Sequence, residues 1–104
     1  MSSELKITDE LVDESVVVNV AGEIDIYTAQ MLREKLYEIV DEKQKDLRIN
    51  CKDLNYIDST GVGIFVGVLK KTKAYDKNIY LVGLKDNIKK LFLITGLDKL
   101  FIIE

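Results

Sequence analysis

Along this chain, segments in which every second residue is apolar alternate with segments in which apolar residues recur every three or four positions. Residues 16–20 are a β-branched run and residues 47–51 alternate apolar with polar side chains, so both predict strands. Between them lies the stripe of an amphipathic helix, formed by Ala29, Leu32, Leu36, Ile39 and Val40. Helices that alternate with strands favour a sheet with parallel strands and helical crossovers.

The complete pattern predicts an α/β fold with a mixed sheet and the element order β-β-α-β-α-β-α-β. We expect strands at residues 5–8, 16–20, 47–51, 79–82 and 100–103, the first two paired as a hairpin. We expect helices at residues 28–43, 60–75 and 86–95, and turns or loops at residues 9–15, 22–25 and 52–55.

Particular residues are predicted to mark the ends of the helices. Thr28 and Asp86 are expected to cap the N-termini of the first and third helices. Gly96 is expected to follow the third helix in a left-handed conformation. The first half of the second helix is apolar all round, which predicts that it is largely buried.

A chain of 104 residues allows one domain, which we expect to span residues 1–104. The sequence has no histidine, so a Ser-His-Asp triad and a Cys-His pair are excluded and the commonest zinc ligand is missing. The single cysteine, Cys51, excludes an intrachain disulfide and is expected to be a small core residue. We therefore expect no catalytic residues, no metal site and no cofactor.

The net charge of −3 gives no electrostatic footprint for direct binding of nucleic acid. Residues 1–60 carry 7 basic and 14 acidic side chains, whereas residues 61–104 carry 8 basic and 4 acidic ones. This asymmetry suits either a protein partner or two ordinary solvated surfaces. The first ten residues contain no apolar signal segment, and the longest uncharged stretch, residues 59–69, is too short to span a bilayer. We therefore expect a cytoplasmic protein without a membrane segment.

The densest cluster of chemistry-bearing residues is the run Asp58-Ser59-Thr60-Gly61-Val62-Gly63. One interpretation is structural, because Asp, Ser and Thr are favoured helix N-caps and the glycines, with Gly67, allow close packing on the sheet. A second is a nucleotide site, although the glycine spacing matches neither the dinucleotide fingerprint nor a P-loop. A third is a covalent switch, in which phosphate on Ser59 lies at a helix N-terminus. The residues alone leave all three open.

Two motifs, in order and about 35 residues apart, resemble those of the STAS domain family of bacterial anti-sigma factor antagonists. The stretch YIDSTGVGIFVG resembles the family signature, and the earlier GEIDIYTAQMLREKL resembles the segment that opens the family's first helix. The resemblance extends to residues 16–20, to LRINCKDLNYID and to KKLFLITGLDKLF, so it covers the whole chain.

The resemblance implies a single STAS domain, with a sheet backed by helices on one side, and no catalytic activity. It implies that the unphosphorylated protein binds an anti-sigma factor that is also a serine kinase, and thereby frees a sigma factor for transcription. It places the phosphoacceptor at Ser59, with Thr60 as the rival acceptor, and implies that a PP2C-type phosphatase reverses the modification. The residues expected to bind the partner are Glu23, Asp25, Thr28, Asp58, Ser59, Thr60, Gly61 and Gly63.

Other functions remain as alternatives. Within the same family, the chain could be a scaffold or a regulatory subunit of another complex. Outside it, the glycine-rich run leaves weak nucleotide binding as a further candidate. We expect the free protein to be a monomer.

Overall fold

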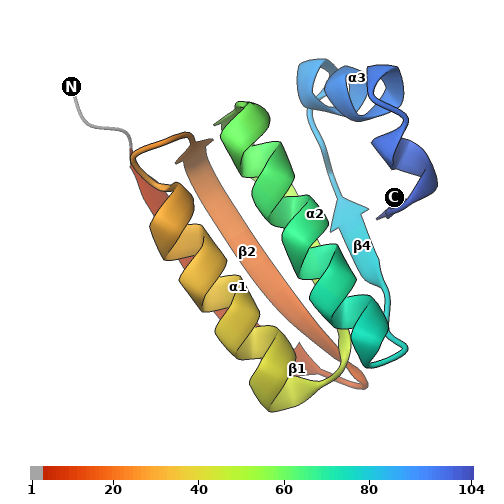
Figure 1. Cartoon of the computed structure of the whole chain (residues 1–104). Coiled ribbons are helices and arrows are strands. Elements are labelled where there is room, and N and C mark those ends of the chain that lie inside the picture. Colours follow the sequence, from red (N-terminus) through yellow and green to blue (C-terminus); the bar gives the residue numbers. More distant parts are fainter. Residues whose placement is uncertain (1–3) are drawn as a thin grey trace.

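The computed structural model describes residues 4–104, and its strands and helices follow one another in the predicted order (Figure 1). The elements are β1 (Leu5–Val12), β2 (Ser15–Ile24), α1 (Ala29–Lys43), β3 (Asp46–Ile57), α2 (Ser59–Ala74), β4 (Ile79–Val82), α3 (Asp86–Ile94), a 3₁₀ helix η1 (Leu97–Lys99) and β5 (Ile102–Ile103). Among the described elements only η1 has no counterpart in the prediction, and it lies between the expected third helix and the expected last strand.

The five strands form one mixed sheet in the order β1-β2-β3-β4-β5. β1 and β2 are antiparallel, as the predicted hairpin requires, and the other neighbouring pairs are parallel. Figure 1 shows α1 and α2 side by side on one face of the sheet, with α3 beyond the end of β4. The predicted fold class, a small α/β domain with a mixed sheet and helices on one side, is confirmed.

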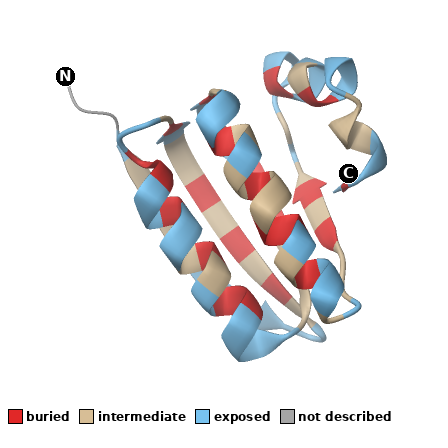
Figure 2. Ribbon diagram, viewed as in Figure 1, coloured by how far each residue is buried: buried red, intermediate tan, exposed pale blue. Residues whose placement is uncertain are grey.

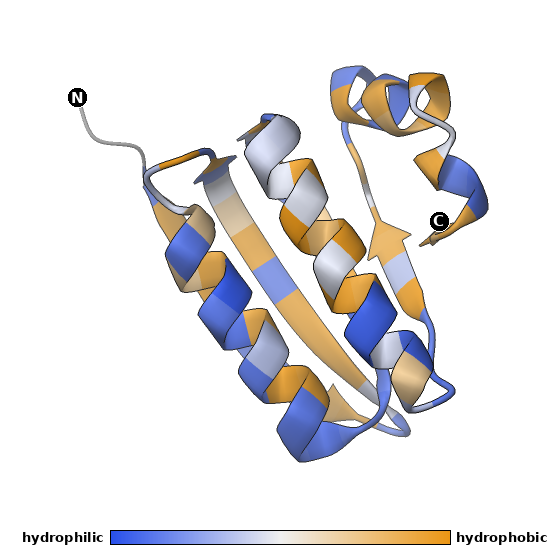
Figure 3. Ribbon diagram, viewed as in Figure 1, coloured by the Kyte–Doolittle hydropathy of each residue, from blue (hydrophilic) through white to orange (hydrophobic). Residues whose placement is uncertain are grey.

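The core lies between the sheet and these helices. The whole predicted stripe of α1 is buried there, and along β2 Val16, Val18 and Val20 are buried while the residues between them are half-buried (Figure 2). α3 contributes Ile88 and Phe92. Figure 3 shows α1 largely hydrophilic on its outer side. Burial of its apolar stripe therefore fixes how α1 lies on the sheet.

The first turn is much shorter than predicted. Residues 9–15 were expected to be a polar turn, but β1 continues to Val12, with Leu11 opposite Val16. Asp13, with a φ of 55°, supplies the left-handed residue that reverses the chain. The polar composition of residues 9–15 led to the wrong prediction because β1 is an edge strand, in which charged side chains are common.

Residues 22–25 and 52–55 were predicted to be a loop and a turn, and both predictions are wrong except at Asp25, which follows the end of β2. β2 runs on through Glu23 to the buried Ile24, and β3 runs on to Ile57. The β2–β3 register shifts between Asn19 and Ala21 and again between Gly22 and Glu23. These irregularities change the spacing of the buried residues, and that hides the strands from a search for strict alternation.

The remaining differences concern the ends of elements. Lys85, not Asp86, is the N-cap residue of α3, and no side chain caps that helix. The last strand covers only Ile102–Ile103 instead of residues 100–103. Gly96 has a φ of 75°, as predicted for the residue after α3. The first half of α2 is buried on one side only, since Gly63 is exposed and Val62 and Ile64 are half-buried.

Candidate functional site

The two motif segments meet at the edge of the sheet where the parallel strands β2 and β3 end. Ile24 is the register partner of Ile57, and the N–H of Asp58 donates a hydrogen bond to the Ile24 carbonyl oxygen over 3.2 Å. Residues 35 or so apart in the sequence are therefore held together by backbone pairing. The ends of parallel strands are a common location for functional loops.

Ser59 is the first residue of α2, and its side chain is exposed. The residue before it, Asp58, is the N-cap, and its Oδ1 atom accepts a hydrogen bond from the N–H of Gly61 over 3.1 Å. The predicted capping role of this run thus belongs to Asp58. Ser59 was expected to precede the helix, whereas it lies within the first turn, so the helix fixes its backbone.

The three glycines of α2 have different surroundings. A Cβ atom on Gly61 would lie 2.5 Å from Cγ2 of Ile24 and 2.7 Å from Cγ1 of Ile57, so this glycine lets α2 pack closely on the sheet. Gly67 instead faces the hydroxyl of Tyr37 on α1, and a Cβ on Gly63 would meet nothing within 4 Å. The predicted close approach to the sheet is therefore confirmed for Gly61 and wrong for the other two.

The loop between β2 and α1 is organised by Asp25. Its Oδ1 atom accepts hydrogen bonds from the N–H groups of Tyr27 over 2.9 Å and of Thr28 over 3.3 Å. Thr28 occupies the N-cap position, but the prediction that its hydroxyl caps α1 is wrong. That hydroxyl donates to the carbonyl oxygen of Glu23 over 2.8 Å and accepts from the N–H of Asp25 over 3.0 Å. Thr28, at the end of the loop, is thereby tied to Glu23 and Asp25 at its beginning.

The predicted site residues fall into three groups by exposure. Glu23, Ser59, Thr60 and Gly63 are exposed, and Asp25 and Asp58 are half-buried. Thr28 and Gly61 are buried and support the surface from below. The carboxylates of Glu23, Asp25 and Asp58 make this part of the surface acidic.

Sequence reasoning missed the apolar side chains beside these groups. Ile26 and Tyr27, in the loop after β2, are 71% and 78% exposed, and Met31 and Tyr56 are also exposed. Large apolar side chains in a short loop were the available signal, because a loop that only connects two elements has no need of them. Exposed aromatic and aliphatic side chains next to acidic ones are typical of protein-binding surfaces.

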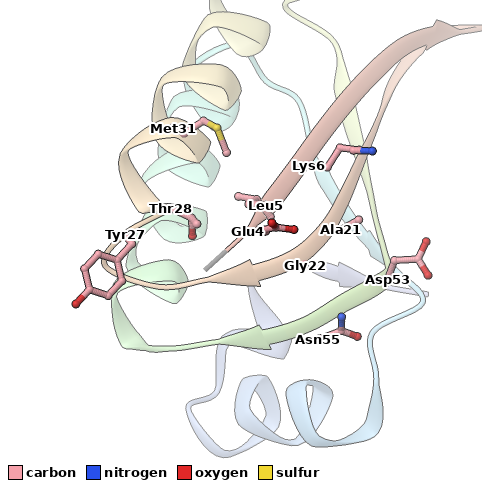
Figure 4. Close-up of a pocket in the computed structure, with 10 residues that line it drawn as sticks. All are labelled: Glu4, Leu5, Lys6, Ala21, Gly22, Tyr27, Thr28, Met31, Asp53 and Asn55. Atoms are coloured by element: carbon pink, nitrogen blue, oxygen red, sulfur yellow. The ribbon is translucent and has the colours of Figure 1, made fainter. Parts of the chain in front are cut away.

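An open depression of about 720 Å³ lies beside this surface (Figure 4). Met31 lines it from α1, Tyr27 from the loop before α1, Glu4 from the residue before β1, and Asp53 and Asn55 from β3. Ser59 does not line it. The depression therefore adjoins the loop before α1, which supplies Tyr27 and Thr28, and does not enclose Ser59.

Cys51 is the free cysteine of the described residues. Cys51 is buried, and burial raises the pKa of its thiol to about 12, so it is not a nucleophile at neutral pH. No group of three or more His, Cys, Asp or Glu side chains within residues 4–104 could hold a metal ion. Over the same residues, no helix has the length and hydrophobicity needed to cross a membrane.

Comparison with known proteins gives one consistent result. The family model described as "STAS domain" matches residues 4–104. The anti-sigma-B factor antagonist of Bacillus subtilis is 45% identical over 92 residues, which cover 88% of this chain and 84% of that protein.

Solved structures show the same fold. An anti-sigma factor antagonist from Mycobacterium paratuberculosis superposes with a TM-score of 0.85 at 27% identity, over 96% of this chain and 85% of that one. The Bacillus cell fate determinant SpoIIAA, solved in its phosphorylated form, superposes with a TM-score of 0.71 at 22% identity, over 99% and 91% of the two chains.

Proposed function

Because the chain belongs to the STAS domain family, we propose that it is an anti-sigma factor antagonist whose binding is switched by phosphorylation. Unphosphorylated, it binds an anti-sigma factor with serine kinase activity, and this binding frees a sigma factor for transcription. The 45% identity to the anti-sigma-B factor antagonist of Bacillus subtilis supports this function. In this scheme the chain is a regulatory protein and the substrate of a kinase, and it performs no catalysis itself.

The phosphoacceptor in this proposal is Ser59. Ser59 is exposed while its backbone is held in the first turn of α2, so a kinase can reach a residue of fixed position. This combination of an exposed serine and a fixed backbone is the observation that carries the proposal. A phosphoryl group adds roughly −1.5 to −2 charges, and a helix N-terminus stabilises such charge by about 0.3–1 kcal/mol at an exposed site. Phosphorylation is therefore compatible with the fold.

The docking surface around Ser59 consists of Glu23, Asp25, Asp58, Thr60 and Gly63, with the exposed Ile26 and Tyr27 beside them. Gly63 leaves open space one turn along α2, into which a partner side chain can pack. Thr28 and Gly61 act indirectly, because they are buried and hold the loop and the helix in place. The carboxylates suit a partner with a basic face.

Phosphorylation breaks the complex through charge and desolvation. The neighbouring carboxylate of Asp58 already makes the α2 N-terminus acidic, and a phosphate on Ser59 adds to that charge. If the partner places apolar or acidic groups directly over the serine, and its basic groups over the neighbouring carboxylates, the phosphate is buried as a poorly paired dianion, which costs several kcal/mol. Since about 1.4 kcal/mol changes affinity tenfold, a cost of this size releases the partner.

The reverse step is hydrolysis of phosphoserine by a PP2C-type phosphatase. The exposure of Ser59 allows a phosphatase to approach it as readily as a kinase. The whole cycle operates in the cytoplasm, without a cofactor bound to this chain and without direct contact with nucleic acid.

The deciding experiment is phosphosite mapping by mass spectrometry after incubation with the cognate kinase and ATP. We expect one phosphate, on Ser59, and none on a Ser59→Ala variant, in which Thr60 remains available as the rival acceptor. Phosphate on another residue contradicts the proposal. So does a Ser59-phosphorylated protein that binds the kinase as tightly as the unmodified one.

A further inference from the structure

Two exposed apolar patches of opposite charge lie far from each other on the molecule. The first, the acidic hairpin, consists of Leu11 and Val12 with Glu10 and Asp13, at the turn between β1 and β2. Leu11 and Val12 are 56% and 43% exposed. None of the ion pairs seen between described residues involves Glu10 or Asp13.

The second patch, the basic corner, consists of Leu93, Ile94 and Leu100 with Lys89 and Lys90, at the end of α3 and after η1. The three apolar side chains are 52%, 73% and 52% exposed. Lys89 precedes Leu93, and Lys90 precedes Ile94, by one helical turn, so each lysine shares a helix stripe with an apolar residue. Neither lysine takes part in an ion pair within residues 4–104.

The fold keeps the two patches apart. The hairpin lies where β2 begins and α3 follows the end of β4, and these strands run in the same direction within the sheet. Figure 1 shows α3 and the β1–β2 turn at opposite ends of the molecule, which measures 36 × 27 × 20 Å. A chain cannot therefore bring its own hairpin to its own basic corner.

We propose that the basic corner of one copy binds the acidic hairpin of a second copy, in a weak head-to-tail association. Both patches expose apolar side chains, and the acidic hairpin is negative where the basic corner is positive. Contact between them therefore buries apolar surface and pairs opposite charges. Patches of a few side chains bury less than a standard interface, so we expect a dissociation constant of about 0.1–1 mM and a monomer at low concentration.

Charge-reversed variants give a direct test by sedimentation velocity, up to a concentration of about 1 mM. We expect the weight-average sedimentation coefficient of the wild-type protein to rise with protein concentration, and to rise less at high salt. Glu10→Lys/Asp13→Lys and Lys89→Glu/Lys90→Glu should each remain monomeric alone, because like charges then face each other. An equimolar mixture of the two variants should associate again, since the reversed hairpin of one complements the reversed corner of the other.

The matched control reverses two exposed glutamates of α1, Glu38→Lys/Glu42→Lys, and changes the net charge as much as the hairpin variant does. It should associate as the wild type does. Thermal melting of each variant establishes that all are folded. A wild-type protein that stays monomeric at every concentration overturns the proposal, as do a mixture that fails to associate and a control that behaves like the hairpin variant.

Discussion

Gly61 lies so close to Ile24 that a Cβ atom on the glycine would stand 2.5 Å from Cγ2 of the isoleucine. Ile24 ends β2 and is fully buried, and Ile57 closes the same space from β3. Gly61 therefore sets the distance between the first turn of α2 and the sheet, and with it the position of Ser59, two residues earlier.

Gly61→Ala should lower the free energy of unfolding by about 1–3 kcal/mol, because the added methyl group overpacks two buried side chains. Gly63→Ala is the matched control, since a Cβ there meets nothing within 4 Å. It should raise stability by about 0.4–1 kcal/mol through loss of unfolded-state entropy. Urea denaturation measures both changes, and equal effects of the two substitutions would show that helix propensity alone matters at these positions.

Asp58→Ala should destabilise the protein by about 1 kcal/mol, because α2 loses the side chain that accepts from the Gly61 N–H. Asp58→Asn keeps an oxygen acceptor and removes the charge. If capping dominates, the Asn variant should retain most of the stability and the Ala variant should not. Chemical denaturation of the pair separates the cap from the charge.

Ser59→Asp should leave the melting temperature within a few degrees of the wild type and weaken binding of the anti-sigma factor by more than about tenfold. Ser59→Ala should bind with undiminished affinity. Titration calorimetry with the purified partner gives the affinities, with Thr60→Ala as the neighbouring control. A Ser59→Asp variant that binds normally yet melts early would point to a structural role for this serine.

Charge reversal separates the roles of Asp25 and Glu23. Asp25→Lys should cost about 0.5–2 kcal/mol of stability, because the carboxylate accepts hydrogen bonds from the N–H groups of Tyr27 and Thr28. The acidic motif alone suggests that reversal at Asp25 weakens binding without affecting melting, and these hydrogen bonds correct that expectation. Glu23→Lys, at an exposed side chain, should weaken binding and leave melting nearly unchanged. Melting curves and partner titrations of both variants provide the comparison.

Stability should decrease at alkaline pH through Cys51. Burial raises the pKa of its thiol from 9.0 to about 12, so the unfolded chain releases this proton at lower pH than the folded one. The resulting stabilisation is complete below pH 9 and is lost as the pH rises from there toward 12. The measurement is the difference in pH dependence of the free energy of unfolding between the wild type and Cys51→Ala, which isolates the contribution of the thiol. Parallel curves for the two proteins would show that the thiol does not cause the loss of stability at alkaline pH.

The sequence predicted those parts of the fold in which side-chain burial follows a regular period. The stripe of α1 and the valines of β2 face one uniform core, so their spacing identified both elements. The second half of β3 escaped detection because its buried residues after Cys51 are Leu54 and Ile57, three positions apart. That spacing follows from the irregular register with β2, which depends on the partner strand and cannot be read from β3 alone.

The candidate site was predictable to a similar extent. The motifs drew attention to Asp58 and Ser59, but the capping preferences of Asp, Ser and Thr left open which of the three residues caps the helix. The roles of Thr28 and Asp25 were not predictable, because either side chain can close such a loop and the choice depends on the backbone conformation at Thr28. The exposure of Ile26 and Tyr27 likewise follows from the loop's position at the end of the sheet.

The hydrogen bond from the Asp58 N–H to the Ile24 carbonyl oxygen links residues far apart in the sequence. It continues the pairing of β2 with β3, and such non-local pairing is a slow step in folding because a long loop must first close. A newly made chain therefore displays the serine on an ordered helix terminus only once its sheet is assembled. Under the proposed function, we therefore expect a kinase that recognises the shape around the hydroxyl to modify folded molecules and not partly folded ones.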